Sequence, residues 1–286
     1  MLPFRNILFP VDYSDPCVGI VPYVRDMASH SSAKLTLYHA YHLGSLASAE
    51  VNLVEPDLLF EARDFEARQL QEFGEKHFPG LRVETCAQDA EAGSGIHELV
   101  DRAGIDLVML PTHGRGPLRR LLLGSVTAKV LHDVRATVWT GVGSTLAGHA
   151  PSIPYRSIVC ALGDGDESEG VLKAAAEVAK AYEAELSLIH VVELPPTSWE
   201  VDLSPYLDEL KESARVKLTG LAKKLNVDAP VTIVTSATAE GVHDEAVSRK
   251  ADLIVTGRGH AHDGIGRVWS RLYAIVRAAP CPVMSV

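Results

Sequence analysis

The sequence predicts an α/β protein made of two tandem, doubly wound domains, each built on a five-stranded parallel sheet. Two observations support this class. The chain repeats itself at a nearly constant spacing, and within each repeat short apolar, β-branched runs alternate with longer segments of helical periodicity. Such alternation is typical of parallel sheets covered by helices on both faces. The two halves are therefore expected to share one fold.

Three segments of the first half recur in the second. The first two pairs have an offset of 151 residues and the third an offset of 146. The pairs are FRNILFPVDYSD (4–15) with YRSIVCALGDGD (155–166), AKLTLYHAYHL (33–43) with AELSLIHVVEL (184–194), and GIHELVDRAGIDLVMLPTHG (95–114) with GVHDEAVSRKADLIVTGRGH (241–260). A tandem duplication predicts domains at 1–142 and 155–286. The Gly-, Ser- and Pro-rich stretch 143–154 is expected to be the linker.

Each element of the first domain follows from its local pattern. Strands are expected at residues 6–11, 34–41, 82–87, 106–112 and 136–140, and helices at 21–32, 56–78, 95–104 and 125–134. The strands are almost continuously apolar, as buried parallel strands are, whereas the helices repeat apolar residues at three- and four-residue spacing. His39 and His190, which lie at equivalent points inside apolar strands, are expected to be hydrogen-bonded core residues.

Composition excludes several classes of function. The net charge of −10 disfavours nonspecific nucleic-acid binding. No stretch approaches the roughly 20 apolar residues of a membrane helix, so no membrane span is expected. The N-terminal apolar run is too short for a signal peptide. The four cysteines are far apart and are expected to be reduced, which favours a cytoplasmic protein without disulfides.

A binding site is expected where the carboxyl ends of the strands meet, because doubly wound sheets bind ligands there. In the first domain Asp12 follows strand one, and the segment from Pro111 to Val130 follows strand four. Gly114 and Gly116 allow close backbone approach to a ligand. Gly124-Ser125 precedes a helix, whose free N–H groups attract phosphate.

Side chains at this edge suit a nucleotide. Ser125 and Thr127 add hydroxyl donors for phosphate, and Asp12 can accept hydrogen bonds from a nucleoside but not from phosphate. A second interpretation remains open, because Ser125 is a favourable helix N-cap and Asp12 a common turn former whether or not anything binds. Arg119 and Arg120 are expected to be solvated.

In combination, these motifs resemble the universal stress protein family in its tandem-domain form. The family's loop pattern is Gly, two residues, Gly, nine residues, then Gly-Ser or Gly-Thr. It appears here as Pro111, Gly114 and Gly124-Ser125. The V-D-x-S opening is present at residues 11–14, the L-H-V strand corresponds to 38–40, and the terminal APCPVMSV is also typical. The resemblance implies two domains of the adenine-nucleotide alpha hydrolase-like fold.

The resemblance also implies ATP as ligand, with Mg²⁺ held by its phosphates. The implied contacts are Pro10, Val11, Asp12, Ala40, Leu110, Pro111, Gly114, Gly116, Gly124, Ser125, Val126 and Thr127. Pro111 departs from the family pattern, which has glycine there. Proline keeps the carbonyl but loses the N–H donor. No general base is evident among these residues, so ATP hydrolysis is expected to be slow at most.

The second domain lacks most of this site. Asp12 is replaced by Gly163, Gly124-Ser125 by Trp269-Ser270, and Thr127 by Leu272. A tryptophan at the phosphate turn is expected to block the cradle, so the second domain is expected to act as a scaffold or regulatory unit without ATP. His260 and His262, with His243 as a third ligand, allow a metal site, although a complete ligand set is not evident.

Family members pair through their last strands, which implies an internal pseudo-dimer that joins TVWTG to PVMSV. A further homodimer is left open. The leading interpretation is a stress-response protein that binds an adenine nucleotide and regulates an unknown protein partner. The alternative is a scaffold or chaperone-like module without nucleotide. An adenylyl-transferring enzyme is disfavoured, because neither H-x-G-H nor S-G-G-x-D-S is present.

Overall fold

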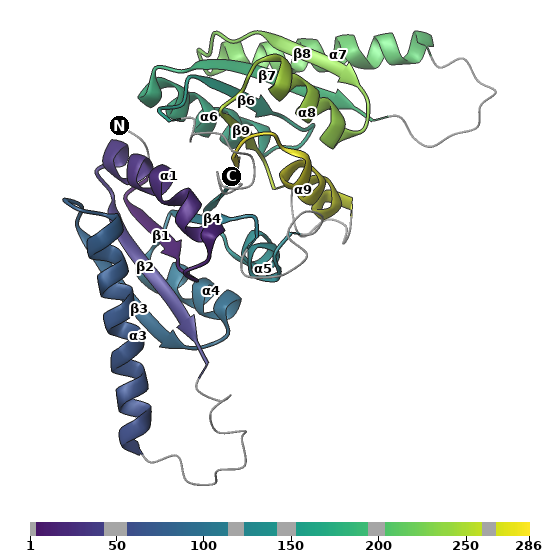
Figure 1. The fold of residues 1–286 in the computed structure, drawn as a ribbon. Coiled ribbons are helices and arrows are strands. Elements are labelled where there is room, and N and C mark those ends of the chain that lie inside the picture. The colour runs from purple at the N-terminus through teal and green to yellow at the C-terminus, as the bar shows by residue number, and fades with distance from the viewer. Residues whose placement is uncertain (1–3, 43–55, 114–122, 142–152, 194–203, 259–266) are drawn as a thin grey trace. The chain divides into compact units, whose positions relative to one another are not determined.

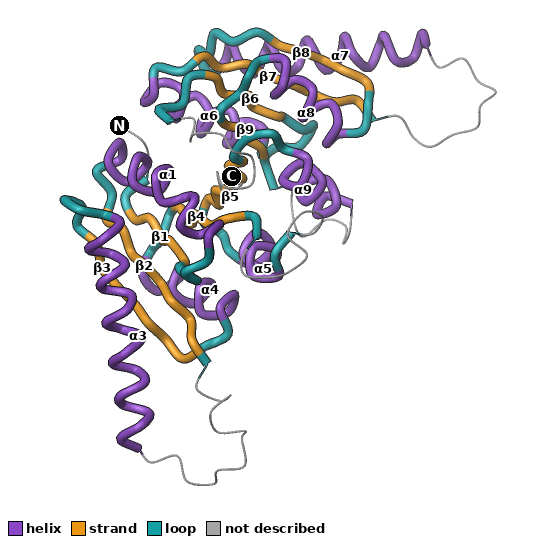
Figure 2. The backbone as a smooth tube through the Cα atoms, in the orientation of Figure 1, coloured by secondary structure: helices purple, strands orange, loops and turns teal. Residues whose placement is uncertain are grey.

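The computed structural model describes residues 4–42, 56–113, 123–141, 153–193, 204–258 and 267–286. These residues form two compact units, which divide between residues 141 and 153. Figure 1 traces the chain through both units, and Figure 2 distinguishes their helices from their strands.

The described part of the first unit alternates strands and helices. Its strands are β1 (Asn6–Pro10), β2 (Lys34–Tyr41), β3 (Val83–Asp89), β4 (Leu107–Pro111) and β5 (Thr137–Gly141). Its helices are α1 (Asp15–Ser31), α3 (Pro56–His77), α4 (Ala92–Ala103) and α5 (Ser125–Asp133). The strands pair in the order β3-β2-β1-β4-β5, and all four pairs are parallel.

The second unit repeats this arrangement. Its strands are β6 (Ser157–Ala161), β7 (Glu185–Val192), β8 (Val231–Thr235), β9 (Leu253–Thr256) and β10 (Val283–Ser285). Its described helices are α6 (Ser168–Tyr182), α7 (Ser204–Lys224), α8 (Thr238–Ser248) and α9 (Arg267–Ala278). The order β10-β9-β6-β7-β8 is again fully parallel. The predicted tandem, doubly wound α/β class is confirmed. The predicted pairing of the last strands stays a prediction.

Helices of each unit associate in pairs. Arg25 of α1 donates to the carbonyl oxygen of His77 at the end of α3. Lys129 Nζ of α5 is 2.8 Å from Glu91 Oε2, at the start of α4. In the second unit, Lys224 Nζ of α7 is 2.6 Å from Glu169 Oε2 of α6. These bonds tie α1 to α3, α4 to α5, and α6 to α7.

Two helices begin earlier than the apolar periodicity predicts. The helix expected from residue 21 begins at Asp15, because the Ser14 side chain caps it by accepting from the Cys17 N–H. The helix expected from residue 95 begins at Ala92, where the Glu91 carboxylate accepts from two backbone N–H groups. Caps set these helix starts, and periodicity alone does not register caps.

Equivalent backbone bonds confirm the duplication in three dimensions. Asp106 Oδ2 accepts the N–H of Arg5 at 2.8 Å, and Asp252 Oδ2 accepts the N–H of Arg156 at the same distance. In each unit this aspartate, at the start of the fourth strand, holds the start of the first. The four cysteines are free, as expected from their spacing. None of the helices in the described ranges combines the length and apolar character that a membrane crossing requires.

The Glu91 carboxylate makes the first unit sensitive to acid. Hydrogen bonds from Lys129, from the Ser94 hydroxyl and from the Gly93 N–H hold the pKa of Glu91 at about 2, below its usual value of 4.5. Its contribution to stability is therefore fully present above about pH 4.5 and is lost as pH falls through about 2. Glu91 is half exposed, so water screens the ion pair and Glu91→Gln should cost less than about 1 kcal/mol at pH 7.

Urea unfolding at several pH values checks this expectation. The difference in unfolding free energy between wild type and Glu91→Gln should shrink as pH falls from 5 towards 2. Lys129→Met, which keeps the aliphatic stem but removes the charge, should remove only the part of this difference that Lys129 supplies, because Ser94 and Gly93 still donate to Glu91. A difference that stays constant over this range would show that the Glu91 carboxylate does not supply it.

Candidate functional site

The carboxyl ends of β1 and β4 form the switch point of the first sheet. β1 lies between β2 and β4, and the chain leaves it in one direction to β2 and β3 and in the other to β4 and β5. Ile7 pairs with Leu107 and Leu8 with Val108, a register that carries Pro10 to the level of Leu110. The structure therefore brings the predicted strand-one and strand-four residues to one edge, where such folds bind ligands.

Asp12 follows β1 and shapes the turn into α1. Its Oδ1 accepts from the Ser14 N–H at 3.0 Å and from the Ser14 hydroxyl at 2.6 Å. The same Ser14 oxygen accepts from the Cys17 N–H and so links Asp12 to the helix start. Burial raises the pKa of the Cys17 thiol to about 12, so this cysteine stays protonated. Asp12 thus acts as a turn former, and its half-buried carboxylate lies at the switch point.

Three residues that sequence reasoning did not assign to the site support this turn. Tyr13 has a left-handed backbone with φ of 59°, which is uncommon for a residue with a side chain. Its ring packs on the rings of His39, at 4.7 Å between centroids, and Phe73. Glu66 of α3 lies 3.5 Å from His39 Nε2. Of these three, only Tyr13 could have been connected with the site from the sequence, because it follows Asp12 directly; Phe73 and Glu66 lie far away in the sequence.

His39 fixes the end of β1 from the neighbouring strand. Its Nδ1 is 2.7 Å from the carbonyl oxygen of Val11, while the Val11 N–H donates to the backbone carbonyl oxygen of Tyr38. This confirms His39 as a hydrogen-bonded structural residue. Ala40, the next residue of β2, is half buried near the same edge.

The N-terminus of α5 is fastened to the end of β4. The Gly124 N–H donates to the Thr112 carbonyl oxygen at 2.9 Å, and the Thr127 hydroxyl donates to the Pro111 carbonyl oxygen at 2.9 Å. The Thr112 N–H in turn donates to the carbonyl oxygen of Gly141, at the end of β5. These bonds hold Pro111, Gly124 and Thr127 together at the switch-point edge.

α5 presents its first backbone N–H groups without using them internally. The first intrahelical bond runs from Ala128 N–H to the Gly124 carbonyl, at 2.8 Å. The N–H groups of residues 125–127 precede that bond and point from the positive end of the helix dipole. Gly124 is the N-cap and Ser125 the first helical residue, so the prediction of Ser125 as N-cap is wrong by one position.

The predicted contacts differ in what they can offer a ligand. The Ser125 side chain is exposed, whereas Thr127 is 4% exposed and its hydroxyl hydrogen is engaged by Pro111. Val11, Leu110 and Pro111 are buried, so only their backbones are available to a ligand. Gly114 and Gly116, predicted for the loop, lie outside the described residues, as do Arg119 and Arg120.

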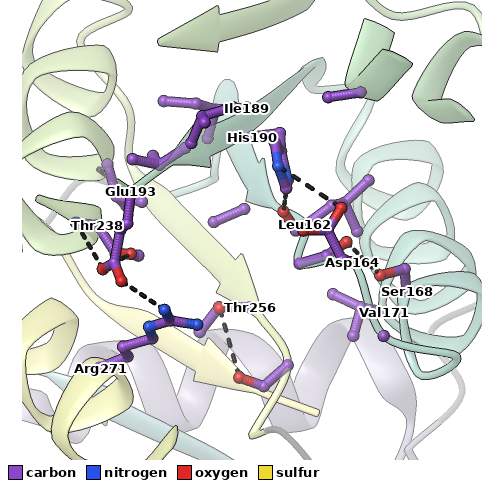
Figure 3. A pocket seen from close by; sticks show the side chains of 18 of the residues that line it. Leu162, Asp164, Ser168, Val171, Ile189, His190, Glu193, Thr238, Thr256 and Arg271 are labelled. Atoms are coloured by element: carbon purple, nitrogen blue, oxygen red, sulfur yellow. Dashed lines mark hydrogen bonds and ion pairs between the residues drawn. The ribbon is translucent and has the colours of Figure 1, made fainter. Parts of the chain in front are cut away.

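The second unit keeps the frame of this edge but lines it differently. His190 Nδ1 is 2.8 Å from the Leu162 carbonyl oxygen, and the Leu162 N–H donates to Ile189, which reproduces the arrangement around His39. Where Asp12 stands in the first unit, Gly163 follows β6. A cavity of about 780 Å³ opens here, between the ends of β6, β7 and β9 (Figure 3).

An ion pair closes one side of this cavity. The Glu193 carboxylate accepts from the N–H and hydroxyl of Thr238 and from the Arg271 guanidinium, as Figure 3 shows. Burial opposes ionisation of Glu193, but the bonds from Thr238 and Arg271 prevail and hold the pKa of its carboxyl below the usual value. Arg271 is therefore neutralised from within the unit.

Trp269, which is predicted to block the phosphate turn of the second unit, does not lie in a turn. α9 begins at Arg267, so Trp269 is part of the helix and does not occupy the turn before it. Its side chain lies outside the described residues, as do His260 and His262 of the metal hypothesis. Within the described ranges, no group of three or more His, Cys, Asp or Glu side chains could hold a metal ion.

Sequence comparison identifies relatives of both units. A model of the universal stress protein family matches residues 3–140 and again 154–286. Universal stress protein A homolog 1 of Coxiella burnetii is 31% identical over 139 residues, which are 46% of this chain and 96% of that protein. A universal stress protein of Methanocaldococcus jannaschii is 30% identical over 141 residues, 46% of this chain and 82% of that protein.

Solved structures resemble the fold along nearly the whole chain. A universal stress protein of Archaeoglobus fulgidus superposes with a TM-score of 0.66 at 18% identity, and covers 98% of this chain and 95% of its own. A Pseudomonas aeruginosa protein of unknown function gives a TM-score of 0.65 at 14% identity, with coverages of 99% and 92%. At these identities the likeness concerns the fold.

Proposed function

The chain belongs to the universal stress protein family, and on that premise we propose that its first unit binds ATP. Nucleotide occupancy would then regulate how this stress-response protein meets a protein partner whose identity is unknown. The observation that carries the proposal is the fastening of the α5 N-terminus to the end of β4. This places the N–H groups of residues 125–127 at the switch-point edge.

The phosphate end of the nucleotide would be held by α5. Three adjacent N–H groups at a helix N-terminus, together with the exposed Ser125 hydroxyl, can donate to phosphate oxygens. Gly124 leaves the approach to these donors free of a side chain. Thr127 would contribute its N–H, because its hydroxyl already donates to Pro111.

The nucleoside end would lie towards β1 and β2. Asp12 has two carboxylate oxygens, and Oδ1 already accepts from Ser14, so Oδ2 is the natural acceptor for a ribose hydroxyl. Ala40 presents a small side chain near the adenine. Pro111 offers only a carbonyl, which Thr127 shares, so this departure from the family's glycine should reduce affinity without removing the site.

Mg²⁺ would be held by the phosphates themselves, a common mode for this ion. Hydrolysis is proposed to be slow at most. Asp12 would lie at the nucleoside end, and His113 Nδ1 already pairs with the Thr112 hydroxyl at 3.0 Å. Neither is arranged as a general base for water that attacks the terminal phosphate.

Two hydroxyl variants test how the phosphates are held. Ser125→Ala should weaken ATP binding several-fold and leave stability nearly unchanged, because Ser125 is exposed. Thr127→Val should lower the free energy of unfolding by about 1–2 kcal/mol, because the buried Pro111 carbonyl loses its donor. Its effect on ATP affinity should be the smaller of the two. Calorimetric ATP titration and urea unfolding measure both quantities.

The wild-type protein supplies the decisive control. Nucleotide released from the purified protein by denaturation should contain adenine, and nucleotide-free protein should bind ATP in the titration. A wild-type chain that carries no nucleotide and shows no ATP binding would refute the proposal. A larger affinity loss in Thr127→Val than in Ser125→Ala would instead reverse the assignment of the two hydroxyls.

A scaffold without nucleotide is the second candidate. One observation favours it, namely that Asp12 has a complete structural role as the turn former that orients Ser14 for capping α1. In that case Asp12 would be present for the turn alone. The same titration separates the candidates, since a scaffold binds its partner equally with and without ATP.

A further inference from the structure

The cavity of the second unit lies at the switch point of its own sheet but differs chemically from a phosphate site. Its floor is formed by the ends of β6, β7 and β9. Apolar side chains from the strands, α8 and α9 line about half of its surface, among them Leu162, Ile189, Val242, Leu272 and Ile275, and polar groups line the rest. A volume of about 780 Å³ whose wall has apolar and polar parts in equal measure suits a small organic ligand that has both an apolar body and a polar group.

One pole of the cavity is already neutral. Arg271 stands on the first turns of α9, where a free cation would favour phosphate, but its guanidinium is bound to Glu193. Glu193 is held in place by Thr238 as well, through both the N–H and the hydroxyl. A phosphate that approached Arg271 would have to displace this carboxylate and would leave it without its cation.

The other pole is acidic. Glu167 precedes α6, and its carboxylate covers a hollow formed by glycines at the ends of β6 and β9. A β-carbon on Gly165 would be 2.1 Å from Glu167 Oε2, and one on Gly257 would be 3.2 Å from Glu167 Cγ. The glycines therefore make room for this carboxylate. Asp164 adds a second carboxylate, whose Oδ1 is 3.7 Å from His190 Nε2 (Figure 3) and whose side chain is 70% exposed.

The charges of the lining favour a cation. Among the lining residues that the structure describes, three carboxylates (Asp164, Glu167 and Glu193) face two cations (Lys217 and Arg271), and Arg271 is paired with Glu193. With histidine counted as neutral, these described groups carry a net charge of −1. A concave, partly apolar wall strengthens this field, which repels polyphosphate and attracts an ammonium group.

We propose that this cavity binds a small organic amine with an apolar body. The ammonium group donates to Asp164 and Glu167, and the body rests on the apolar floor between the two poles. The second unit is then a ligand-binding unit of a different class from the first. This proposal does not depend on ATP binding by the first unit.

Phenethylamine is a suitable probe, with 2-phenylethanol as its neutral counterpart of similar shape. Calorimetric titration of the full chain should show the amine binding at least about tenfold tighter than the alcohol, because only the ammonium group forms ion pairs with the carboxylates and it has three N–H donors, whereas the alcohol has one O–H donor and no charge. The double variant Asp164→Asn with Glu167→Gln should remove that preference. Glu177→Gln with Asp228→Asn, which removes two exposed carboxylates of the same unit outside the cavity lining, should leave it intact.

A steric variant keeps the test independent of charge. Ser213 of α7 lines the cavity and is exposed, so Ser213→Trp can fill the mouth without disturbing the core and should abolish binding of both probes. Equal affinity for amine and alcohol, no binding of either, or displacement of the amine by pyrophosphate would each overturn the proposal. So would amine binding that survives both the double variant and Ser213→Trp.

Discussion

Replacing Gly124 with tryptophan is expected to reduce ATP affinity at least about 100-fold, because the indole would cover the N–H groups at the start of α5 and several charge-assisted hydrogen bonds would be lost. The unit should remain folded. Gly124 has φ of −59° and ψ of 144°, which any residue adopts. A β-carbon there would meet its nearest neighbour, the Thr112 carbonyl oxygen, at 3.4 Å. Calorimetric ATP titration measures the loss, and circular dichroism monitors folding.

Gly124→Ala is the matched control for this variant. It adds the same β-carbon without the ring, so its ATP affinity should stay within a few-fold of wild type. Asp12→Ala, at the nucleoside end, should weaken ATP binding and leave inorganic pyrophosphate binding unchanged. If the tryptophan variant binds ATP as wild type does, the phosphates do not occupy the α5 N-terminus and the assignment of the site is wrong.

Replacing Gly95 with alanine is expected to destabilise the first unit by about 2 kcal/mol, although alanine favours helices by about 1 kcal/mol over glycine. The reason is steric. A β-carbon on Gly95 would be 1.8 Å from the Tyr38 hydroxyl oxygen and 2.9 Å from its Cζ. Tyr38 is 1% exposed and cannot move aside without disturbing the core. The free energy of unfolding in urea gives the magnitude.

The same substitution elsewhere should have the opposite sign. A β-carbon added to Gly170 of α6 would have no described atom within 4 Å, so Gly170→Ala should raise stability by up to about 1 kcal/mol. Tyr38→Phe should partly rescue Gly95→Ala, because it removes the nearest atom. The Tyr38 hydroxyl has no hydrogen-bond partner among the described residues. Additive effects in this double-mutant cycle would show that the two residues do not meet as described.

Much of the fold could be predicted from the sequence because its signals are local. The strand predicted at 34–41 has the bounds of β2, and the helix predicted at 56–78 ends one residue beyond α3. Both have long periodic patterns with clear limits. α1 begins six residues before its predicted start, because its first turn is set by Ser14 and Pro16 and not by apolar spacing.

The chemistry of the site is less predictable, because it depends on how the elements meet. The sequence predicts that Thr127 donates its hydroxyl to phosphate, but the docking of α5 turns that hydroxyl towards Pro111. No local pattern specifies which way a threonine at a helix start will point. The prediction of Gly124 and Ser125 at the helix start needs only sequence neighbours and places them correctly at the beginning of α5.

The second unit illustrates the same limit more strongly. Glu193 and Arg271 are 78 positions apart, and the glycines around Glu167 come from the ends of two different strands. Alignment of the two repeats predicts that the second unit lacks equivalents of Asp12 and Thr127. Alignment cannot show that a cavity with charged residues of its own lies there, because the cavity is formed by side chains that come together only in the folded unit.

The shared pairing of His39 with Val11 and of His190 with Leu162 has a consequence for a duplicated chain. The side chain that shapes each edge comes from the second strand, whereas the residues that differ, Asp12 and Gly163, follow the first. Shape and selectivity thus depend on separate positions, and one can drift without the other. Because both edges belong to one polypeptide, the two proposed binding sites are present in a one-to-one ratio, however much of the protein is made. A response that needs both ligands would therefore depend on solute concentrations alone, not on the relative abundance of two proteins.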